Sequence, residues 1–409
     1  MVDDLFGDER LCDERTELLI NRLFDLPINY VGNKKKLIWQ ILEMLRDEHV
    51  EFNTVFDAFS GSCVVSLMFN RMGKNVISND LLAMSSLAAV FYLEARSFPL
   101  SLSDVDGLCT GVPSEPYNKN MSSRYKWRFF LPAEADMLDR FRSNLGSIVG
   151  GVYTGMKIGS SGAPEPSFIR LGNGSCPDKS FGSFAMHSMC THVLQKCFLG
   201  GRYYNGQTIC KLRTSLKRGR TNKNVLERGN DMRTIMHKLK NVFLPDLHPA
   251  RNIMADFVEN PTPGKCQVFN CDVIKLLESN FVNADVAYFD PPYGGESSDY
   301  GALYGICEEY VRGCDPMLVP EFATASGRFK GKSEYRNNFE ILLNLSKRFP
   351  VWLFSFNESS YSSIEDIVKL IKKFRSDIVV RPIKNYGYNY RKKTNSRDRE
   401  SEWLILARA

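Results

Sequence analysis

The sequence predicts an α/β protein built on a doubly wound, mostly parallel sheet. Strand and helix signals alternate from Tyr30 to about Ala95, and the alternation resumes at Cys266 after a long interruption. Strands that alternate with helices pair in parallel, with the helices as crossover connections. The interruption indicates that an inserted domain separates the two halves of the sheet in the chain.

The first half of the predicted core contains two strands, over residues 54–56 and 75–78. Helical patterns follow them, over 63–72 and 81–95. An earlier helix face is marked by apolar side chains at helical spacing, namely Ile38, Ile41, Leu42 and Leu45. This part of the chain therefore supplies two strand-to-helix turns, where ligands bind in sheets of this kind.

The second half contains further short apolar runs, and strands are predicted over 266–269, 286–289, 350–355, 378–380 and 402–406. One more helix is indicated by the spacing of Ile364, Ile367, Val368, Ile371 and Phe374. Ser362 and Glu365 have the spacing of a capping box at the start of that helix.

The interruption has two parts. Residues 100–185 are rich in Gly, Ser, Pro and Asn, and irregular chain of that length is uncommon inside a core. Residues 196–251 hold thirteen Lys or Arg against three acids. We therefore divide the chain into an N-terminal arm with the first half of the core (1–98), an inserted domain (99–262) and the second half of the core (263–409).

Composition limits the class of protein. The 409 residues are 43% hydrophobic and 24% charged, which is ordinary for a soluble globular protein. No run reaches the apolar length of a membrane span, and the acidic start lacks the features of a signal peptide, so we expect a cytoplasmic protein with no membrane partner. The 11 cysteines form no Cys-x-x-Cys pair and the 5 histidines are dispersed, so we expect no metal site.

Asp290-Pro291-Pro292-Tyr293, at the end of the predicted strand 286–289, is the most informative motif. Proline has no amide donor, so the carbonyls here are left to accept hydrogen bonds from a ligand. Asp290 and the carbonyl of Pro291 together suit an amino group, and Tyr293 suits the flat ring that carries it. The ordinary alternative is a proline-rich turn with a capping aspartate.

A second motif, Asp57-Ala58-Phe59-Ser60-Gly61-Ser62-Cys63, follows the strand over 54–56. Small residues and a glycine at a strand-to-helix turn allow a ligand to approach the backbone near a helix N-terminus. Asp80 ends the next strand, where an acid suits the hydroxyls of a ribose. Asp272 follows the third strand and could accept from an adenine amino group or cap a helix. The turn lacks the Gly-Lys-Ser/Thr of a phosphate loop, which disfavours ATP hydrolysis.

Taken together, these motifs resemble the S-adenosylmethionine-dependent DNA adenine-N6 methyltransferases of the alpha group, the DNA adenine methylases. The resemblance covers roughly residues 26–98 and 263–409, and it implies a Rossmann-like methyltransferase sheet with an antiparallel strand near the C-terminus. Tyr30-Val31-Gly32-Asn33-Lys34 is similar to the family's N-terminal element, and the motifs occur in the alpha-group order. Two residues depart from the family pattern. Ala58 replaces the usual proline and Cys63 the usual second glycine.

The resemblance implies which residues act. The expected catalytic residues are Asp290, Pro291, Pro292 and Tyr293. The expected residues at the S-adenosylmethionine site are Tyr30, Gly32, Lys34, Asp57, Phe59, Ser60, Gly61, Asp80 and Asp272. The inserted domain would recognise DNA. The expected DNA contacts are Arg202, Tyr203, Asn205, Arg213, Lys217, Arg218 and Arg220, with Arg391 and Lys392 in a second basic patch.

The implied reaction moves a methyl group to the N6 amino group of an adenine flipped out of double-stranded DNA, leaves S-adenosylhomocysteine and needs no metal. A cognate restriction endonuclease is the further partner that the resemblance suggests, in a prokaryotic or phage-encoded system. Two alternatives stay open at this point. The same acceptors suit the N4 amino group of cytosine, and the chain could instead bind DNA through a transferase core that has lost its activity.

Overall fold

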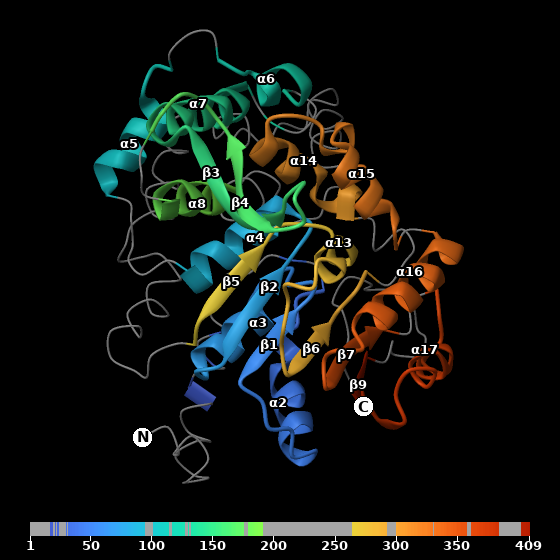
Figure 1. The fold of residues 1–409 in the computed structure, drawn as a ribbon. Coiled ribbons are helices and arrows are strands. Elements are labelled where there is room, and N and C mark those ends of the chain that lie inside the picture. The colour runs from blue at the N-terminus through green and yellow to red at the C-terminus, as the bar shows by residue number, and fades with distance from the viewer. Residues whose placement is uncertain are drawn as a thin grey trace, which may run out of the picture.

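The computed structural model describes residues 17–18, 21, 23, 30, 32–94, 101–113, 117–126, 130, 132–175, 179–190, 264–292, 300–329, 331–357, 361–383 and 402–409. Within these ranges nine strands form one sheet in the order β4-β3-β5-β2-β1-β6-β7-β9-β8. The central strands pair in parallel, whereas β9 runs antiparallel between β7 and β8. The mostly parallel sheet with an antiparallel strand near the C-terminus is confirmed (Figure 1).

The strands are β1 (Thr54–Asp57), β2 (Asn75–Asn79), β3 (Gly151–Ile158), β4 (Pro164–Arg170), β5 (Cys266–Phe269), β6 (Val286–Phe289), β7 (Val351–Asn357), β8 (Asp377–Ile383) and β9 (Glu402–Arg408). The α-helices are α2 (Ile38–Asp47), α3 (Val64–Arg71), α4 (Ala83–Ala89), α5 (Leu102–Thr110), α6 (Asn120–Arg124), α7 (Pro132–Val149), α8 (Lys179–Ser188), α13 (Val273–Glu278), α14 (Tyr300–Arg312), α15 (Pro320–Gly327), α16 (Lys332–Leu345) and α17 (Ile364–Ile371). Short 3₁₀ turns are η1 (Lys35–Leu37) and η5 (Pro316–Leu318), and the π-helical turn η2 (Val90–Glu94) continues α4.

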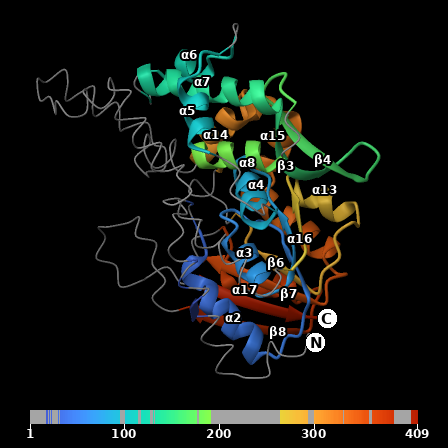
Figure 2. The same ribbon diagram turned by 90° about the vertical axis from the view of Figure 1, so that its left-hand side faces the viewer.

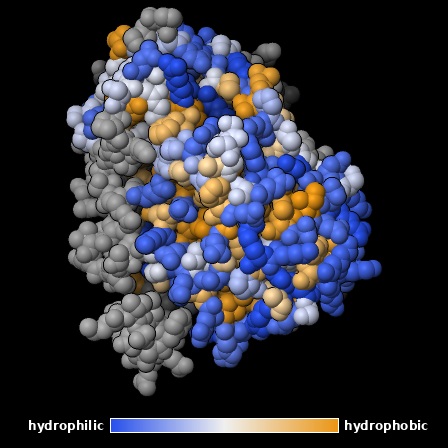
Figure 3. All heavy atoms as spheres, in the orientation of Figure 1, coloured by the Kyte–Doolittle hydropathy of each residue, from blue (hydrophilic) through white to orange (hydrophobic). Residues whose placement is uncertain are grey.

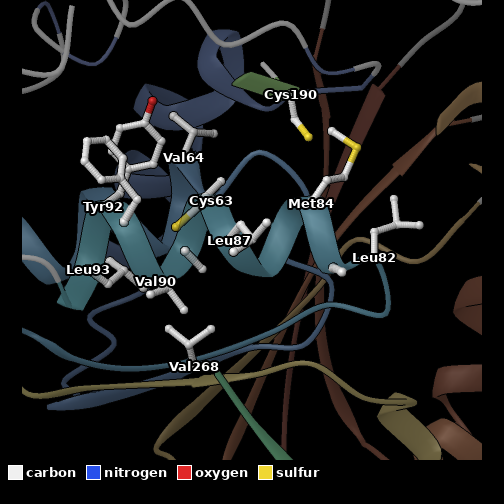
Figure 4. Close-up of a cluster of buried hydrophobic side chains, with 14 of the residues drawn as sticks. Cys63, Val64, Leu82, Met84, Leu87, Val90, Tyr92, Leu93, Cys190 and Val268 are labelled. Carbon is white, nitrogen blue, oxygen red and sulfur yellow. The ribbon is translucent and has the colours of Figure 1, made fainter. Parts of the chain in front are cut away.

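Both faces of the central strands are buried. Successive side chains of a strand point to opposite faces, so each of these strands contributes to two hydrophobic layers. In β6, Val286 and Tyr288 join one hydrophobic cluster, and Ala287 and Phe289 join the other. The first cluster contains side chains of α2, α3 and α4, and the second contains those of α13, α16 and α17. Figure 4 shows part of the first cluster, where side chains of α3, α4, η2 and β5 converge. Helices on both faces make the sheet doubly wound, as predicted.

The described part of the predicted insert is built into this core. The hairpin of β3 and β4 extends the sheet beyond β5, and Met156 pairs with Phe269 in parallel. Side chains of α5, α7 and α8 belong to the first hydrophobic cluster, together with those of the core helices. Figures 1 and 2 both show α5, α6, α7 and α8 at the end of the molecule opposite α2.

Three expectations about local structure need correction. The described residues of 100–185 form α5, α6, α7, the first part of α8 and the β3–β4 hairpin, which the composition of this stretch did not indicate. The helix predicted over 81–95 begins at Ala83, and it gives way to a π turn at Val90. The capping box of α17 lies one residue later than predicted, because the side chain of Ser363 accepts from the amide of Asp366, and Asp366 returns the bond.

The surface is mixed in character. On the face in Figure 3, apolar side chains appear in patches towards the centre of the molecule, and hydrophilic ones cover most of its right-hand edge. None of the helices within the described ranges has both the length and the apolar character of a membrane span.

Candidate active site

A cleft opens at the carboxyl ends of β1, β2 and β6, and the space between its walls, including the solvent at its mouth, is about 1080 Å³. Most of the residues predicted for the two motifs line it together, namely Tyr30, Gly32, Lys34, Asp57, Phe59, Ser60, Gly61, Asp80, Asp272, Asp290 and Pro292. The sheet therefore brings both predicted motifs to one cavity, although a long stretch of chain separates them.

The turn after β1 requires glycine at position 61. Gly61 has a φ of +49°, and a Cβ atom built there would lie 2.8 Å from a ring carbon of Tyr30. The Tyr30 ring has little room to retreat, because it stacks on Tyr304 with ring centroids 4.8 Å apart. Because Gly61 has no side chain, the Tyr30 ring can pack directly against the turn after β1.

The two departures from the family pattern have structural explanations. The amide of Ala58 donates to the carbonyl of Tyr288 at 3.1 Å, a bond between the β1 turn and β6 that proline could not make. Cys63 has a φ of +63° directly before α3, so it adopts the left-handed conformation that favours glycine. Its side chain is fully buried in the first hydrophobic cluster (Figure 4).

Asp57 is a buried carboxyl group with incomplete hydrogen bonding. Its Oδ2 accepts from the hydroxyl of Ser66 at 2.7 Å. Its Oδ1 has no hydrogen-bond partner among the described residues, and the same holds for the hydroxyl of Ser60. Burial raises the pKa of Asp57 from 3.8 to about 7, more than the bond from Ser66 lowers it. A ligand that brought a hydrogen-bond donor or a positive charge to Asp57 would relieve this cost.

Asp80 holds the β1 turn against the end of β2. Its two oxygens accept from the backbone amides of Gly61 at 2.7 Å and Leu82 at 2.8 Å. Burial is the main cause that raises its pKa to about 7. Both acids at this side of the cleft are therefore buried carboxyl groups that accept from neutral donors.

Asp272 lies in the cleft wall, but its side chain already has protein partners. One oxygen caps α13 by accepting from the amide of Ile274 at 3.1 Å. The other accepts from Nε of Arg328 at 2.7 Å. The helix-capping alternative considered for Asp272 is thus observed, and its bond to a cofactor amino group stays a prediction.

Asp290 follows β6 and lies next to a buried lysine. Nζ of Lys34 is 3.0 Å from Oδ1 of Asp290 and 3.1 Å from Oε1 of Glu402. Lys34 is 3% exposed and Glu402 is fully buried, whereas the side chain of Asp290 is 17% exposed towards the cleft that it lines. Pro291 is buried, and Pro292 lines the cleft.

Two parts of this site were not predicted from the sequence. One is an aromatic wall from α15 and the turn after it, where Phe322 and Phe329 line the cleft and Phe329 meets Phe59 edge-on with centroids 5.8 Å apart. The other is the pair of Glu402 and Asn357, in which Nδ2 of Asn357 donates to Glu402 at 2.9 Å. Glu402 was predicted only as the start of a strand, and a buried acid there needs a cation from elsewhere in the chain.

Some predicted residues lie outside the described ranges. They are Tyr293 of the catalytic motif and the predicted DNA contacts Arg202, Tyr203, Asn205, Arg213, Lys217, Arg218, Arg220, Arg391 and Lys392. Among the residues that are described, no group of three or more His, Cys, Asp or Glu side chains could hold a metal ion.

Comparison with known proteins agrees with this chemistry. Residues 30–97 match the family model described as D12 class N6 adenine-specific DNA methyltransferase. The chain is also 24% identical over 353 residues to a protein of Haemophilus parahaemolyticus named Type II methyltransferase M2.HphI. That similarity covers 85% of this chain and 87% of the relative. Together these findings support an adenine-specific N6 DNA methyltransferase.

Proposed function

We propose that this chain transfers a methyl group from S-adenosylmethionine to the N6 amino group of an adenine in double-stranded DNA. The observation that carries the proposal is the shared cleft, which is lined both by the turn from Asp57 to Gly61 and by Asp290 and Pro292. A methyl donor and an amine that accepts the methyl must meet in one cavity for direct transfer. The matched family and the name of the relative support adenine in DNA as the substrate.

The residues present fit S-adenosylmethionine. The buried Oδ1 of Asp57 and the hydroxyl of Ser60 have no partners among the described residues, so each can accept from or donate to a ligand. The missing Cβ of Gly61 leaves room beside Tyr30. When bound, S-adenosylmethionine supplies an electrophilic methyl group on a positively charged sulfur. We assign Tyr30, Gly32, Asp57, Phe59, Ser60, Gly61 and Asp80 to hold it, with Phe329 as a further wall.

Asp290 and the Pro291 carbonyl would prepare the amine. The lone pair of an adenine amino nitrogen is shared with the ring, which makes the nitrogen a poor nucleophile. If Asp290 and that carbonyl accept both amino hydrogens, the nitrogen is drawn towards tetrahedral geometry and its lone pair is freed. Positioning and electrostatics supply most of the effect, and Asp290 need not act as a strong base, because the proton becomes acidic once the nitrogen is methylated.

A duplex hides this amino group, so the base must leave the helix before it can reach the cleft. We propose that Tyr293 stacks on the extruded base, which by comparison with single-strand binders is worth roughly 1–3 kcal/mol. We also propose that the basic segment 196–251 contacts the phosphates, with Arg213, Lys217, Arg218 and Arg220 as the leading candidates. The further partner we propose is a restriction endonuclease that cuts the same DNA sequence, in the cytoplasm where bacterial or phage DNA lies.

The test is expression of the chain in a bacterial host that lacks DNA methylation, followed by nucleoside analysis of the host DNA. We expect N6-methyladenine to appear, and to be absent from the same host with an empty vector. N4-methylcytosine in its place would overturn the adenine assignment. DNA with no new methylated base, from cells that contain the folded protein, would overturn the proposed activity.

A further inference from the structure

Four polar side chains form one buried chain of contacts from the sheet to the cleft. Asn357 donates to Oε2 of Glu402 at 2.9 Å, and Oε1 of Glu402 lies 3.1 Å from Nζ of Lys34. The same Nζ lies 3.0 Å from Oδ1 of Asp290. Lys34, Asn357 and Glu402 are almost fully buried, and Asp290 alone is partly exposed, at the cleft.

The sheet fixes this arrangement. Asn357 ends β7 and Glu402 begins β9, and the two residues are partners in the antiparallel register of these strands. β7 also pairs with β6, the strand that ends directly before Asp290. Lys34 comes from the opposite end of the chain, where it precedes η1 and its carbonyl accepts from the amide of Leu37, the last residue of that turn. Three neighbouring strands therefore hold the acids in place, and one lysine bridges them.

The charges explain why the lysine is shared. A buried ammonium or carboxylate is costly unless a partner compensates it, and Glu402 is too deep for water to do so. Lys34 compensates Glu402, and its attraction also favours the ionised form of Asp290, the form that accepts hydrogen bonds. Asp57 and Tyr288 also interact electrostatically with Asp290.

We propose that Lys34 is a positioning residue for the methyl transfer, held in place by Glu402 and Asn357, and that it keeps Asp290 ionised and oriented towards the substrate amine. This inference rests on the proposed function. It changes the role predicted for Lys34, from contact with the cofactor to support of the catalytic acid. Glu402 and Asn357 act through Lys34 and touch no reacting atom.

The experiment compares a double variant, Lys34→Met/Glu402→Gln, with a control of the same charge change, Lys372→Met/Glu365→Gln. Removing both buried charges together avoids an unpaired charge in the interior, so the double variant is expected to fold. Both control positions are exposed on or directly after α17, away from the cleft. Thermal unfolding, the cofactor Kd, kcat and the pH dependence of kcat are measured for each protein.

We expect the double variant to unfold within a few degrees of the parent protein and to bind the cofactor within about threefold of its Kd. Its kcat should fall roughly 10- to 100-fold, the size of the effect for one oriented charged partner. The acid limb of the kcat profile should move to higher pH, because Asp290 has lost the cation that favours its ionised form. The control pair should match the parent in all four measurements.

Single variants test whether Glu402 acts through Lys34. The kcat of the double variant should be no lower than that of Lys34→Met, because Glu402 has nothing left to position once the lysine is gone and the single variant leaves its carboxyl group unpaired in the interior. A double variant with the parent's kcat and pH profile would overturn the proposal. So would a Lys34→Met protein with weakened cofactor binding and unchanged kcat, which would restore the cofactor role. Failure of the parent protein to methylate DNA would instead overturn the proposed function.

Discussion

The two sides of the cleft differ in how their acids are balanced. Asp290 lies 3.0 Å from the ammonium of Lys34, which the chain itself supplies. Asp57 and Asp80 are also buried, yet within the described ranges neither forms a salt bridge, and both accept only from hydroxyl or amide donors. Burial raises the pKa of both to about 7. If the proposed function holds, the charge of Asp290 is balanced within the chain itself, whereas the charges of Asp57 and Asp80 would be balanced by the positive charge of the cofactor.

The substitution Asp290→Ala should produce the largest difference between the two sides of the cleft. Turnover should fall at least about 10²- to 10³-fold, the loss typical when one oriented hydrogen-bonding group is removed at a transition state. The cofactor Kd should stay within about threefold, because Lys34 and Glu402 remain as a balanced buried pair. Single-turnover methylation and calorimetry measure the two quantities. Full turnover by the variant would remove Asp290 from the catalytic role.

Asp80→Ala should have the opposite profile. The cofactor Kd should rise roughly 10- to 100-fold, as expected for the loss of hydrogen bonds to a charged group of 1.5–3 kcal/mol. The amides of Gly61 and Leu82 also lose their acceptor, so the β1 turn should loosen. Asp80→Asn is the matched control, since its single oxygen can still accept from one of the two amides. An unchanged cofactor Kd in Asp80→Ala would refute the ribose role.

The dependence of cofactor binding on pH should separate the two sides further. The pKa of Asp57 in the folded chain, about 7, lies above its ordinary value of 3.8, so Asp57 is largely protonated at pH 6 and largely ionised at pH 8. Because a cationic ligand prefers the ionised form, affinity should rise over this range, by up to about tenfold for one such group. Calorimetry at pH 6, 7 and 8 tests this, and Asp57→Asn should flatten the response, leaving the part due to Asp80.

The titration of Asp57 also determines whether the folded protein gains or loses stability as pH rises. A raised pKa in the folded state means that the contribution of Asp57 to stability is full below about pH 4, and it is lost as pH rises through 7. The ligand-free protein should therefore lose thermal stability between pH 6 and 8, and Asp57→Asn should lose less. Cofactor binding that weakens with rising pH, or stability that increases over this range, would contradict the balance of charges described here.

Gly61→Ala should have the smallest effect. A left-handed φ costs a residue with a Cβ roughly 1–2 kcal/mol, and the new methyl would press on the Tyr30 ring. We expect lower thermal stability and a several-fold weaker cofactor Kd, with turnover at saturating cofactor nearly unchanged. Gly305→Ala is a fitting control, because a Cβ there meets no atom within 4 Å. If Gly61→Ala and Gly305→Ala had the same thermal stability and cofactor Kd, close packing of Tyr30 against the β1 turn would not be needed for cofactor binding.

The core could be predicted from sequence because its strands are short apolar runs that can be recognised without knowledge of the neighbouring strands. The run from Val286 to Phe289 is apolar and aromatic, it is buried on both faces, and an acid with two prolines follows it. A short buried strand followed by such residues ends at the ligand edge of a parallel sheet. The same reasoning places Asp57 and Asp80, and for that reason the two motifs could be assigned to one cleft.

The strands of the insert were harder to predict, because a glycine and a register shift interrupt the regular pattern of β3. β3 contains Gly155 at φ +102°, beside a register shift between Tyr153 and Met156. A Cβ at Gly155 would lie 2.6 Å from the carbonyl of Val268 in β5, so the glycine allows the hairpin to lie close to the core. Glycine in a strand resembles a loop signal when the neighbouring strand is unknown. The ion pairs of Lys34 could not be predicted for a related reason, since Asp290 and Glu402 are distant from it in the chain.

The contact between Lys34 and Glu402 has a consequence for the order in which the protein acquires its activity during synthesis. The residues lie near opposite ends of this sequence, and β9 must dock between β7 and β8 before the contact can form. At ribosomal speeds of 5–20 residues per second, roughly 20–70 s pass between the translation of the two residues. In a nascent chain the contact that supports Asp290 would therefore be among the last to form, so full turnover would wait for the final strand.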